Sequence, residues 1–524
     1  IAIKGFTIQA VGTTQEIAAL VGPNTRTIDL DGRLAIPGLI DSHGHYMSLG
    51  HSKLILDLTQ ARTWEEIVGM VGEAAAQAEP GEWILGRGWH QEKWAVVPAE
   101  TVDGVPLHDG LSRVSPENPV NLTHASGHAS FANAMALELA GIDGTTPDPD
   151  GGTIVKAPDG RPTGLLRETA QRLVGRAIAH SQEGRSSQDI EAEEREAVRL
   201  AGEDALSKGV TSFHDAGSNF ATIDFFRRLE EEGNLPVRLY VMVRRESNEE
   251  MATRLPEYKM LPEGNDFLTV RSIKRQVDGA LGAHGAWLLE PYEDLESTGL
   301  VLEPLEDIMG TARVALEHGF QVNTHAIGDR GNREILDLYE EAFREAGVVG
   351  QALRWRIEHA QHLHPDDVGR FAELGVIPSM QAIHCTSDAP WVLQRLGPDR
   401  AESGAYMWRD LIDSGAVVNN GTDTPVEDVD PLPGFYASVS RIMPNGEAFF
   451  PGQAMTREEA LASYTINGAY SAFEEDIKGS LTPGKYADIV VLSRDIMTIP
   501  VQEILDTEVD YTIVGGEVRF TRQN

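Results

Sequence analysis

Eight short apolar segments recur along the chain, and each of them ends in polar residues. Helical stretches separate most of them, such as 190–207, 305–318, 329–346 and 365–374. Alternating β and α segments are typical of a parallel sheet, so eight of them predict an α/β fold of the (β/α)8 TIM-barrel type. A doubly wound open sheet is the alternative, but no glycine-rich dinucleotide turn follows a strand. The predicted strands are 36–42, 209–215, 236–243, 270–277, 320–325, 354–359, 375–380 and 416–422.

The segment that separates the first two predicted strands in the sequence is far longer than one barrel crossover needs. We therefore expect residues 50–205 to contain the first helix and a large insertion after barrel strand one. This segment has strand-like pieces of its own at 83–89 and 119–124. Because insertions at the end of a barrel strand lie beside the site, we expect this one to shape a substrate pocket.

Both ends of the chain are rich in β-forming residues and glycine turns. Two distant segments of this kind predict one small sheet domain that both termini complete. We expect residues 1–35 and 478–524 to form a β-sandwich, with the barrel and its insertion in 36–477.

Composition narrows the class of protein. The 524 residues exceed the usual size of a single core. A net charge of −37 is expected to repel nucleic acid and anionic membranes, but it says little about the substrate. We expect a small-molecule substrate as the partner, with a homo-oligomer as an open possibility. Cys385 is the single cysteine, so an intrachain disulfide and a cysteine metal cluster are excluded. We expect a cytoplasmic protein, although the chain does not start with Met and a leader peptide is left open.

Ligand-type side chains stand at the ends of several predicted strands, and such ends meet on one rim of a barrel. In His43-Gly-His45 the two imidazoles point the same way, because side chains alternate along a strand. His325, His359 and Asp423 end strands five, six and eight, and Lys274 lies in strand four. Imidazoles and a carboxylate are suited to Zn²⁺ and to related divalent metals.

Each of these residues also has an ordinary structural interpretation. Asp423 could be a helix N-cap before Thr424-Pro425, and a single strand-end histidine such as His325 is usually a hydrogen-bonded packing residue. Their joint placement favours a metal site. A metal there would lower the pKa of bound water to about 7, and Asp423 would accept the proton and pass it to a leaving group.

Several motifs resemble the amidohydrolase superfamily, including Ile36-Pro-Gly-Leu-Ile-Asp-Ser-His-Gly-His45, Thr324-His-Ala-Ile-Gly-Asp329, Arg356-Ile-Glu-His-Ala-Gln361 and Gly421-Thr-Asp423. Trp89, Ser126-Gly-His128, Asp278-Gly-Ala-Leu-Gly282 and His384-Cys-Thr-Ser-Asp-Ala-Pro-Trp391 are similar to the amidohydrolase-3, YtcJ-like branch, which includes N-substituted formamide deformylases. The resemblance covers essentially the whole chain.

The resemblance implies metal ligands at His43, His45, His325, His359 and Asp423. It also implies that Lys274 is the position where binuclear members carry a carboxylated lysine between two metals. One or two Zn²⁺ ions are thus expected, two if Lys274 is carboxylated. Candidate substrate-binding residues are Trp89, His128 and His384, with Trp94 and His214 as further candidates. His284 departs from the pattern of many relatives, and a solvent-facing loop histidine is an equal interpretation.

We expect a metal-dependent hydrolase that cleaves a C–N bond of an amide, N-substituted formamide, urea or cyclic amide by metal-activated hydroxide. One alternative keeps the scaffold but performs deamination or ester or lactone hydrolysis. The deaminase interpretation is weakened because the segment after His325 offers no early catalytic Glu, the nearest being Glu334. The other alternative is a non-catalytic, metal-binding scaffold protein.

Overall fold

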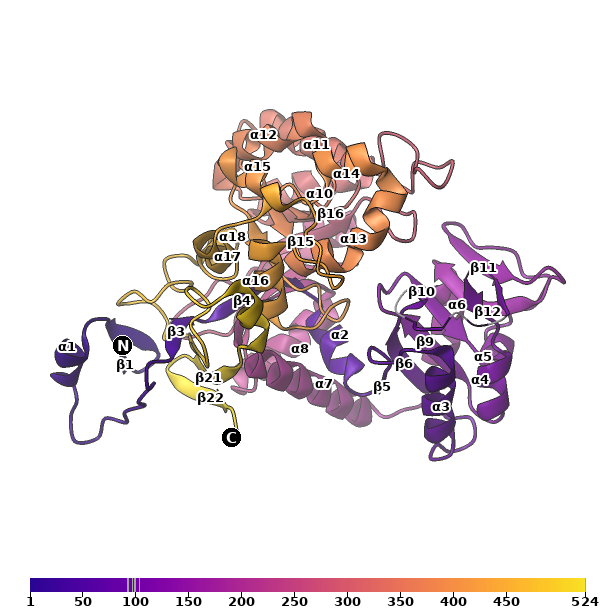
Figure 1. Cartoon of the computed structure of the whole chain (residues 1–524), viewed down its shortest axis with the longest axis horizontal. Helices are drawn as coiled ribbons and strands as arrows, with labels where there is room; N and C mark the ends of the chain where they lie inside the picture. The colour runs from indigo at the N-terminus through magenta and orange to yellow at the C-terminus, as the bar shows by residue number, and fades with distance from the viewer. Residues whose placement is uncertain (92–93, 97, 99, 103, 524) are drawn as a thin grey trace. The chain divides into compact units, whose positions relative to one another are not determined.

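The computed structural model describes residues 1–91, 94–96, 98, 100–102 and 104–523 (Figure 1). The chain divides into two compact units, residues 1–46 with 201–524 and residues 47–200. No helix among the described residues is long and apolar enough to cross a membrane.

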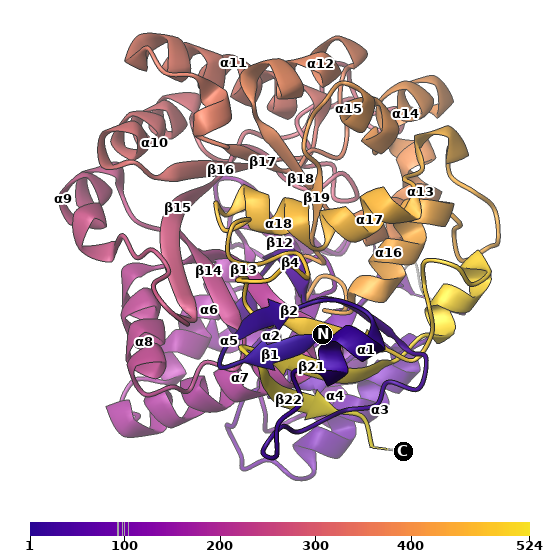
Figure 2. The same cartoon turned by 90° about the vertical axis from the view of Figure 1, so that its left-hand side faces the viewer.

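The larger unit is built on eight parallel strands. Helices lie outside these strands in Figure 2, from α8 (Phe220–Glu231) through α9 (Asn248–Tyr258) to α12 (Pro365–Leu374). This arrangement confirms the predicted (β/α)8 barrel. Its strands in spatial order are β4 (Leu39–Gly44), β13 (Val210–Ser218), β14 (Arg238–Val243), β15 (Leu268–Gln276), β16 (Gln321–Ala326), β17 (Arg356–His359), β18 (Ile377–Met380) and β19 (Asn419–Asn420).

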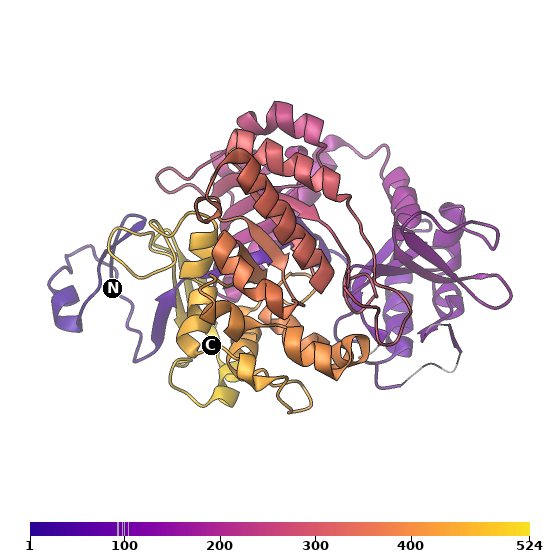
Figure 3. The same ribbon diagram turned by 90° about the horizontal axis from the view of Figure 1, so that it is seen from above.

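Three barrel helices begin and end where the sequence predicts: α10 (Leu305–His318), α11 (Asp329–Ala346) and α12. Each is followed by a glycine with a left-handed backbone, which stops the helix without the steric cost of a Cβ atom. Seen from above, these helices overlie the strands of the barrel (Figure 3).

The first predicted strand, 36–42, is wrong as a single element. It divides at Gly38 into β3 (Leu34–Pro37), which belongs to another sheet, and β4. A Cβ atom on Gly38 would lie 2.1 Å from Thr211 Oγ1, so only glycine allows the chain to pass this strand so closely. The eighth predicted strand, 416–422, is also too long, because only two of its residues pair with β18.

The remaining gap in the barrel is bridged by backbone hydrogen bonds beyond β19. Asp423 N donates to His43 O at 2.7 Å, and His45 N donates to Thr424 O at 2.8 Å. These bonds join the last strand region to the first and bring the two ends of the sheet together.

A smaller sheet combines both ends of the chain, in the order β22 (Glu517–Thr521), β21 (Val509–Val514), β20 (Ile489–Leu492) and β3. The hairpin of β1 (Ala2–Lys4) and β2 (Thr7–Ala10) is hydrogen-bonded to residues 484–487. Two distant segments therefore complete one β-rich region, and its definition as a separate β-sandwich domain of 1–35 and 478–524 stays a prediction.

A buried ion pair connects this β-rich region to the barrel. Arg238 at the start of β14 binds Asp488 through Nε at 2.8 Å and Nη2 at 3.2 Å. Both side chains are about 5% exposed or less. Asp488 Oδ1 also accepts from Gly515 N, and the guanidinium stacks on Tyr486. Both oxygens of the Asp488 carboxylate thus accept hydrogen bonds, which is the condition under which a buried charge is tolerated.

The second unit contains a six-stranded mixed sheet with the order β11 (Gly152–Lys156), β12 (Pro162–Glu168), β10 (Ala129–Ala132), β9 (Val120–His124), β6 (Ile84–Trp89) and β5 (Leu56–Asp57). The helix α3 (Trp64–Ala75) contributes Trp64, Ile67 and Val71 to a core that also contains Phe131. The two strand-like pieces predicted in the insertion are β6 and β9.

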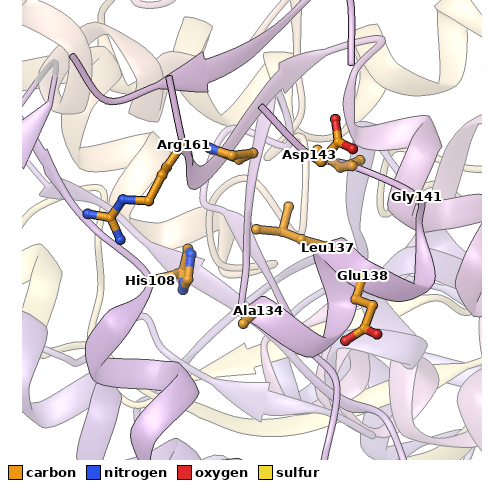
Figure 4. Close-up of a pocket in the computed structure, with 9 residues that line it drawn as sticks. His108, Ala134, Leu137, Glu138, Gly141, Asp143 and Arg161 are labelled. Carbon is orange, nitrogen blue, oxygen red and sulfur yellow. The ribbon is translucent and has the colours of Figure 1, made fainter. Parts of the chain in front are cut away.

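A surface pocket of about 490 Å³ lies in this second unit (Figure 4). Arg161 and His108 stand on one side of it, and Asp143 and Glu138 on the other. His108 Nδ1 lies 2.9 Å from Ser112 Oγ, and Arg161 pairs with Asp159 at 2.8 Å. These pocket side chains already have protein partners.

We predict that Asp488→Ala lowers the free energy of unfolding by about 3–5 kcal/mol, because it leaves Arg238 buried without its counter-charge. Chemical denaturation followed by circular dichroism measures this loss. The matched control is Glu503→Ala, which breaks the exposed pair with Arg494 and should change stability by less than about 1 kcal/mol. Equal effects of the two substitutions would contradict the role given to the buried pair.

Candidate metal centre

Four histidines and one aspartate converge at the carboxyl ends of the barrel strands. His43 Nε2 and His45 Nε2 lie 3.6 and 3.2 Å from Asp423 Oδ1. The ring of His359 lies 4.7 Å from that of His43 and 4.4 Å from that of His325, centroid to centroid. The structure therefore brings together five residues that the sequence places on four different strands.

The meeting of the first and last strands is possible because residue 421 is glycine. A Cβ atom there would lie 2.3 Å from His43 N. Asp41 in β4 connects to the last strand region through two hydrogen bonds. Its Oδ1 accepts from Thr422 N at 2.9 Å, and its Oδ2 accepts from Thr422 Oγ1 at 2.5 Å. The pKa of Asp41 is raised to about 7 by burial. The His43–His45 pair and Asp423 are positioned by this junction.

His43 and His359 each direct Nδ1 to a protein acceptor, and His325 lies close to a carboxylate. His43 Nδ1 contacts Glu358 Oε2, and His359 Nδ1 lies 2.6 Å from Gln381 Oε1. His325 Nε2 lies 3.5 Å from Asp278 Oδ1. When one nitrogen donates to such an acceptor, the other carries the lone pair that binds a metal. The acceptors thus select Nε2 of His43 and Nε2 of His359 as donor atoms.

Behind His43 lies a buried ion pair. Arg356 Nε is 2.7 Å from Glu358 Oε1, and both side chains are fully buried. Arg356 Nη2 also donates to Ser42 O and Ser379 Oγ. Burial alone would raise the pKa of Glu358, but Arg356 and His43 hold it below its ordinary value. The carboxylate facing His43 is therefore an anion.

Lys274 points into the barrel and its neighbour Arg275 points out. Arg275 Nε donates to Thr311 Oγ1 on α10 at 2.6 Å. Lys274 is 2% exposed, and its ammonium interacts electrostatically with Glu358 and Asp423. Its pKa is lowered to about 7, first by burial and then by Arg244. The orientation that a bridging lysine requires is present.

The electrostatics of the centre favour neutral imidazoles beside an ionised carboxylate. The pKa of His43 is lowered to about 4, first by burial and then by Lys274. Burial would raise the pKa of Asp423, but His45 and His43 hold it well below its usual range. His359 and Asp423 have left-handed backbones, with φ of 78° and 57°, an unusual conformation for residues with a Cβ atom. Such strain is typical of functional positions.

This set of donors fits a divalent metal ion. Two groups of three have all their ligand atoms within 4.8 Å of one another: His43, His45 and Asp423, and His359, His384 and Asp423. His43 Nε2 is buried and has no hydrogen-bond partner among the residues that the structure describes. A buried imidazole nitrogen without a partner is costly unless a ligand completes it. We therefore regard the cluster as a candidate His/Asp metal site.

His384, a predicted substrate residue, lies in α13 (Ala382–Leu396) with its ring stacked on His359 at 6.4 Å. His214 lies inside the barrel, 3.2 Å from Arg356 Nη1 through Nδ1. His284 has a left-handed backbone and pairs with Asp294 at 3.0 Å. Of these three, only His384 joins the metal donors.

Trp89 and His128 belong to the second unit. Trp89 is 2% exposed, and its Nε1 donates to Leu122 O at 2.8 Å. Trp94 packs beside it in the same core. His128 Nδ1 lies 3.0 Å from both carboxylate oxygens of Glu168. A contact of Trp89 or His128 with substrate stays a prediction.

Sequence reasoning missed the residues that support the ligands: Asp41, Asp278, Glu358 and Gln381. Asp41 and Glu358 lie within two residues of a candidate ligand histidine. Asp278 lies in the motif Asp278-Gly-Ala-Leu-Gly282. Asp41 precedes His43 by two positions, and Glu358 precedes His359 directly. A carboxylate beside a ligand histidine was the available signal. Gln381 offered none, because an amide after a strand is common.

Comparison with known proteins agrees with this geometry. Residues 26–520 match the amidohydrolase family. The chain is 35% identical to Protein LONG AFTER FAR-RED 3 of Arabidopsis thaliana over 94% of its length and 84% of that protein. It is 31% identical to the putative amidohydrolase YtcJ of Bacillus subtilis, with 99% and 95% covered. It is 26% identical to the N-substituted formamide deformylase of Arthrobacter pascens, with 99% and 94% covered.

Among solved structures, an uncharacterized metal-dependent hydrolase from Pyrococcus horikoshii is similar with a TM-score of 0.73 and 26% identity. The match covers 95% of this chain and 94% of that one. The family match extends over nearly the whole chain, and relatives on the YtcJ-like branch align from end to end. With its barrel and its His/Asp centre, the chain belongs to the amidohydrolase family.

Proposed function

We propose that the protein hydrolyses the C–N bond of an amide, N-substituted formamide, urea or cyclic amide. The observation that carries the proposal is the convergence of His43, His45, His359 and Asp423 at one point of the barrel rim. The N-substituted formamide deformylase relative supports the choice of bond. Ester or lactone hydrolysis and deamination are the competing outcomes of a substrate test.

The imidazole and carboxylate donors are those that Zn²⁺ prefers, so we propose zinc as the metal. When bound, a divalent metal lowers the pKa of water and polarises a carbonyl group. His43, His45, His325 and His359 would hold it, with Asp423 beside them. The supports behind the rings, Glu358, Asp278 and Gln381, keep the donor atoms aimed at that position.

Asp423 is proposed as the proton carrier. Its carboxylate is held in place by the backbone bond to His43 O and by the contact with His45 Nε2. In the reaction the oxygen of water adds to the carbonyl carbon and the C–N bond breaks. One proton of that water passes through Asp423 to the leaving nitrogen. His384 lies beside the centre, where its Nε2 is proposed to hold the carbonyl oxygen.

We predict that Asp423→Asn lowers kcat on a cleaved amide or formamide by about 10³-fold, because an amide cannot carry the proton. Rates are measured with metal-reconstituted protein, together with the metal content of each sample. Asp428→Asn is the control, since this exposed carboxylate lies in the same loop, pairs with Lys208 and accepts from Asp430 N, away from the histidines. If both variants retain the wild-type rate, the assignment of Asp423 is wrong.

We predict that Glu358→Gln weakens metal binding by about 10–100-fold, since the residue behind a ligand histidine orients and polarises it. Competition with a chromogenic chelator measures the affinity without any need for turnover. Glu373→Gln changes an exposed carboxylate on α12 and should leave the affinity unchanged. An unchanged affinity in Glu358→Gln would show that the contact with His43 does not support the metal.

We propose that Lys274 is carboxylated and bridges two metals. Reconstitution with zinc and bicarbonate is expected to give two metals per chain and a mass increase of one carboxyl group on the peptide that contains Lys274. In Lys274→Met the metal content should fall to about one per chain. An unmodified lysine with one metal per chain in the wild type would refute the bridge and leave a mononuclear site.

A further inference from the structure

A second cation, which the proposed reaction does not use, stands on the barrel rim. Arg244 follows β14 directly, so it lies at the carboxyl end of the third barrel strand, where functional groups of this fold gather. Its charge acts on Lys274, and the carboxylates of Glu303, Asp215 and Asp423 act on Arg244 in turn. The guanidinium therefore lies within electrostatic range of the metal centre.

The side chain of Arg244 is held in a defined place. Its backbone N donates to Ser218 O at 2.9 Å. Gly217, with φ of 133°, makes room for the stem, because a Cβ atom there would lie 2.3 Å from Arg244 Cδ. Arg244 Nη2 donates to Gln276 Oε1 at 2.7 Å, and Gln276 Nε2 donates to Asp278 O at 3.2 Å. The amide of Gln276 is thus turned so that its oxygen orients the guanidinium.

Gln276 orients this cation without neutralising it. Other arginines of the barrel interior and rim pair with carboxylates, such as Arg356 with Glu358 and Arg275 with Glu303. Arg244 has no carboxylate within 4.0 Å in the described part of the chain, although acidic residues outnumber basic ones by 81 to 44. The residue as a whole is partly buried. An oriented guanidinium without a paired carboxylate is suited to an incoming anion.

We infer that Arg244 binds a carboxylate group carried by the substrate, so that the enzyme acts on acidic amides such as N-acylated or N-formylated amino acids. The inference rests on the proposed function, because it concerns the compound whose C–N bond is cleaved. A planar guanidinium fork matches a carboxylate through two parallel hydrogen bonds, which adds orientation as well as affinity. Arg244 is then a specificity-determining residue rather than part of the proton transfer.

The test uses two substrates that differ in one group, N-formylglycine and N-formylglycinamide, with the metal-reconstituted full chain. The wild type is expected to prefer the carboxylate. Arg244→Met should lower kcat/KM on the carboxylate by about 10²-fold and change the amide by less than about threefold. Arg245→Met removes the same charge from the exposed neighbouring residue and should keep the preference.

Binding gives a second readout that does not depend on turnover. Calorimetry with succinate, which has no C–N bond, should show binding at least about tenfold weaker in Arg244→Met than in Arg245→Met. Equal treatment of both substrates in all variants, or succinate binding that does not depend on Arg244, would overturn the inference while leaving the proposed function intact. Failure of the wild type to cleave any amide, formamide or urea would instead overturn the proposed function.

Discussion

The site depends on the close contact between the first and last strands of the barrel. Gly421 passes so near His43 N that no side chain fits between them, and Asp41 fastens Thr422 across the same junction. Backbone bonds from Asp423 and His45 complete the closure. Because His43, His45 and Asp423 all come from this junction, their mutual distances follow from backbone packing rather than from flexible side chains.

The interior of the barrel contains buried cations, although the chain as a whole is acidic. The chain is strongly acidic overall, yet Arg356, Lys274 and Arg244 place cations beside or beneath a cluster of histidines. Arg356 is compensated by Glu358, and this pair also fixes the orientation of His43. One buried contact thus serves both the stability of the interior and the direction of a donor atom. Burying such a pair costs free energy, which is offset in part because Arg356 Nη2 donates to Ser42 O, Ser379 Oγ and Glu358 Oε2.

Much of the fold was predictable because strand and helix periodicity is a local property. The helices 305–318, 329–346 and 365–374 end at glycines, which is a signal readable from the sequence. The division of the first apolar run at Gly38 was not predictable, since it depends on Thr211, which approaches from another strand. The same holds for the short eighth strand, whose pairing is replaced by bonds to His43 and His45.

The candidate ligands were also predictable, because strand ends in a barrel share a rim whatever their separation in sequence. Their supports were not, since Gln381 and Asp278 become partners of His359 and His325 only after the strands are placed side by side. Arg244 was missed for the same reason: its significance lies in having no carboxylate within 4.0 Å among the described residues, and such neighbours are not visible in a linear sequence.

The junction between Asp41 and Thr422 spans 381 positions of the chain. During synthesis, the His43–His45 pair leaves the ribosome several hundred residues before Asp423. Until Asp423 follows, the nascent chain carries the candidate histidines without their carboxylate and without the junction that positions them. A metal bound by these donors would consequently be captured only after Asp423 has joined the barrel, and a product cut short before Thr422 would lack the complete donor set.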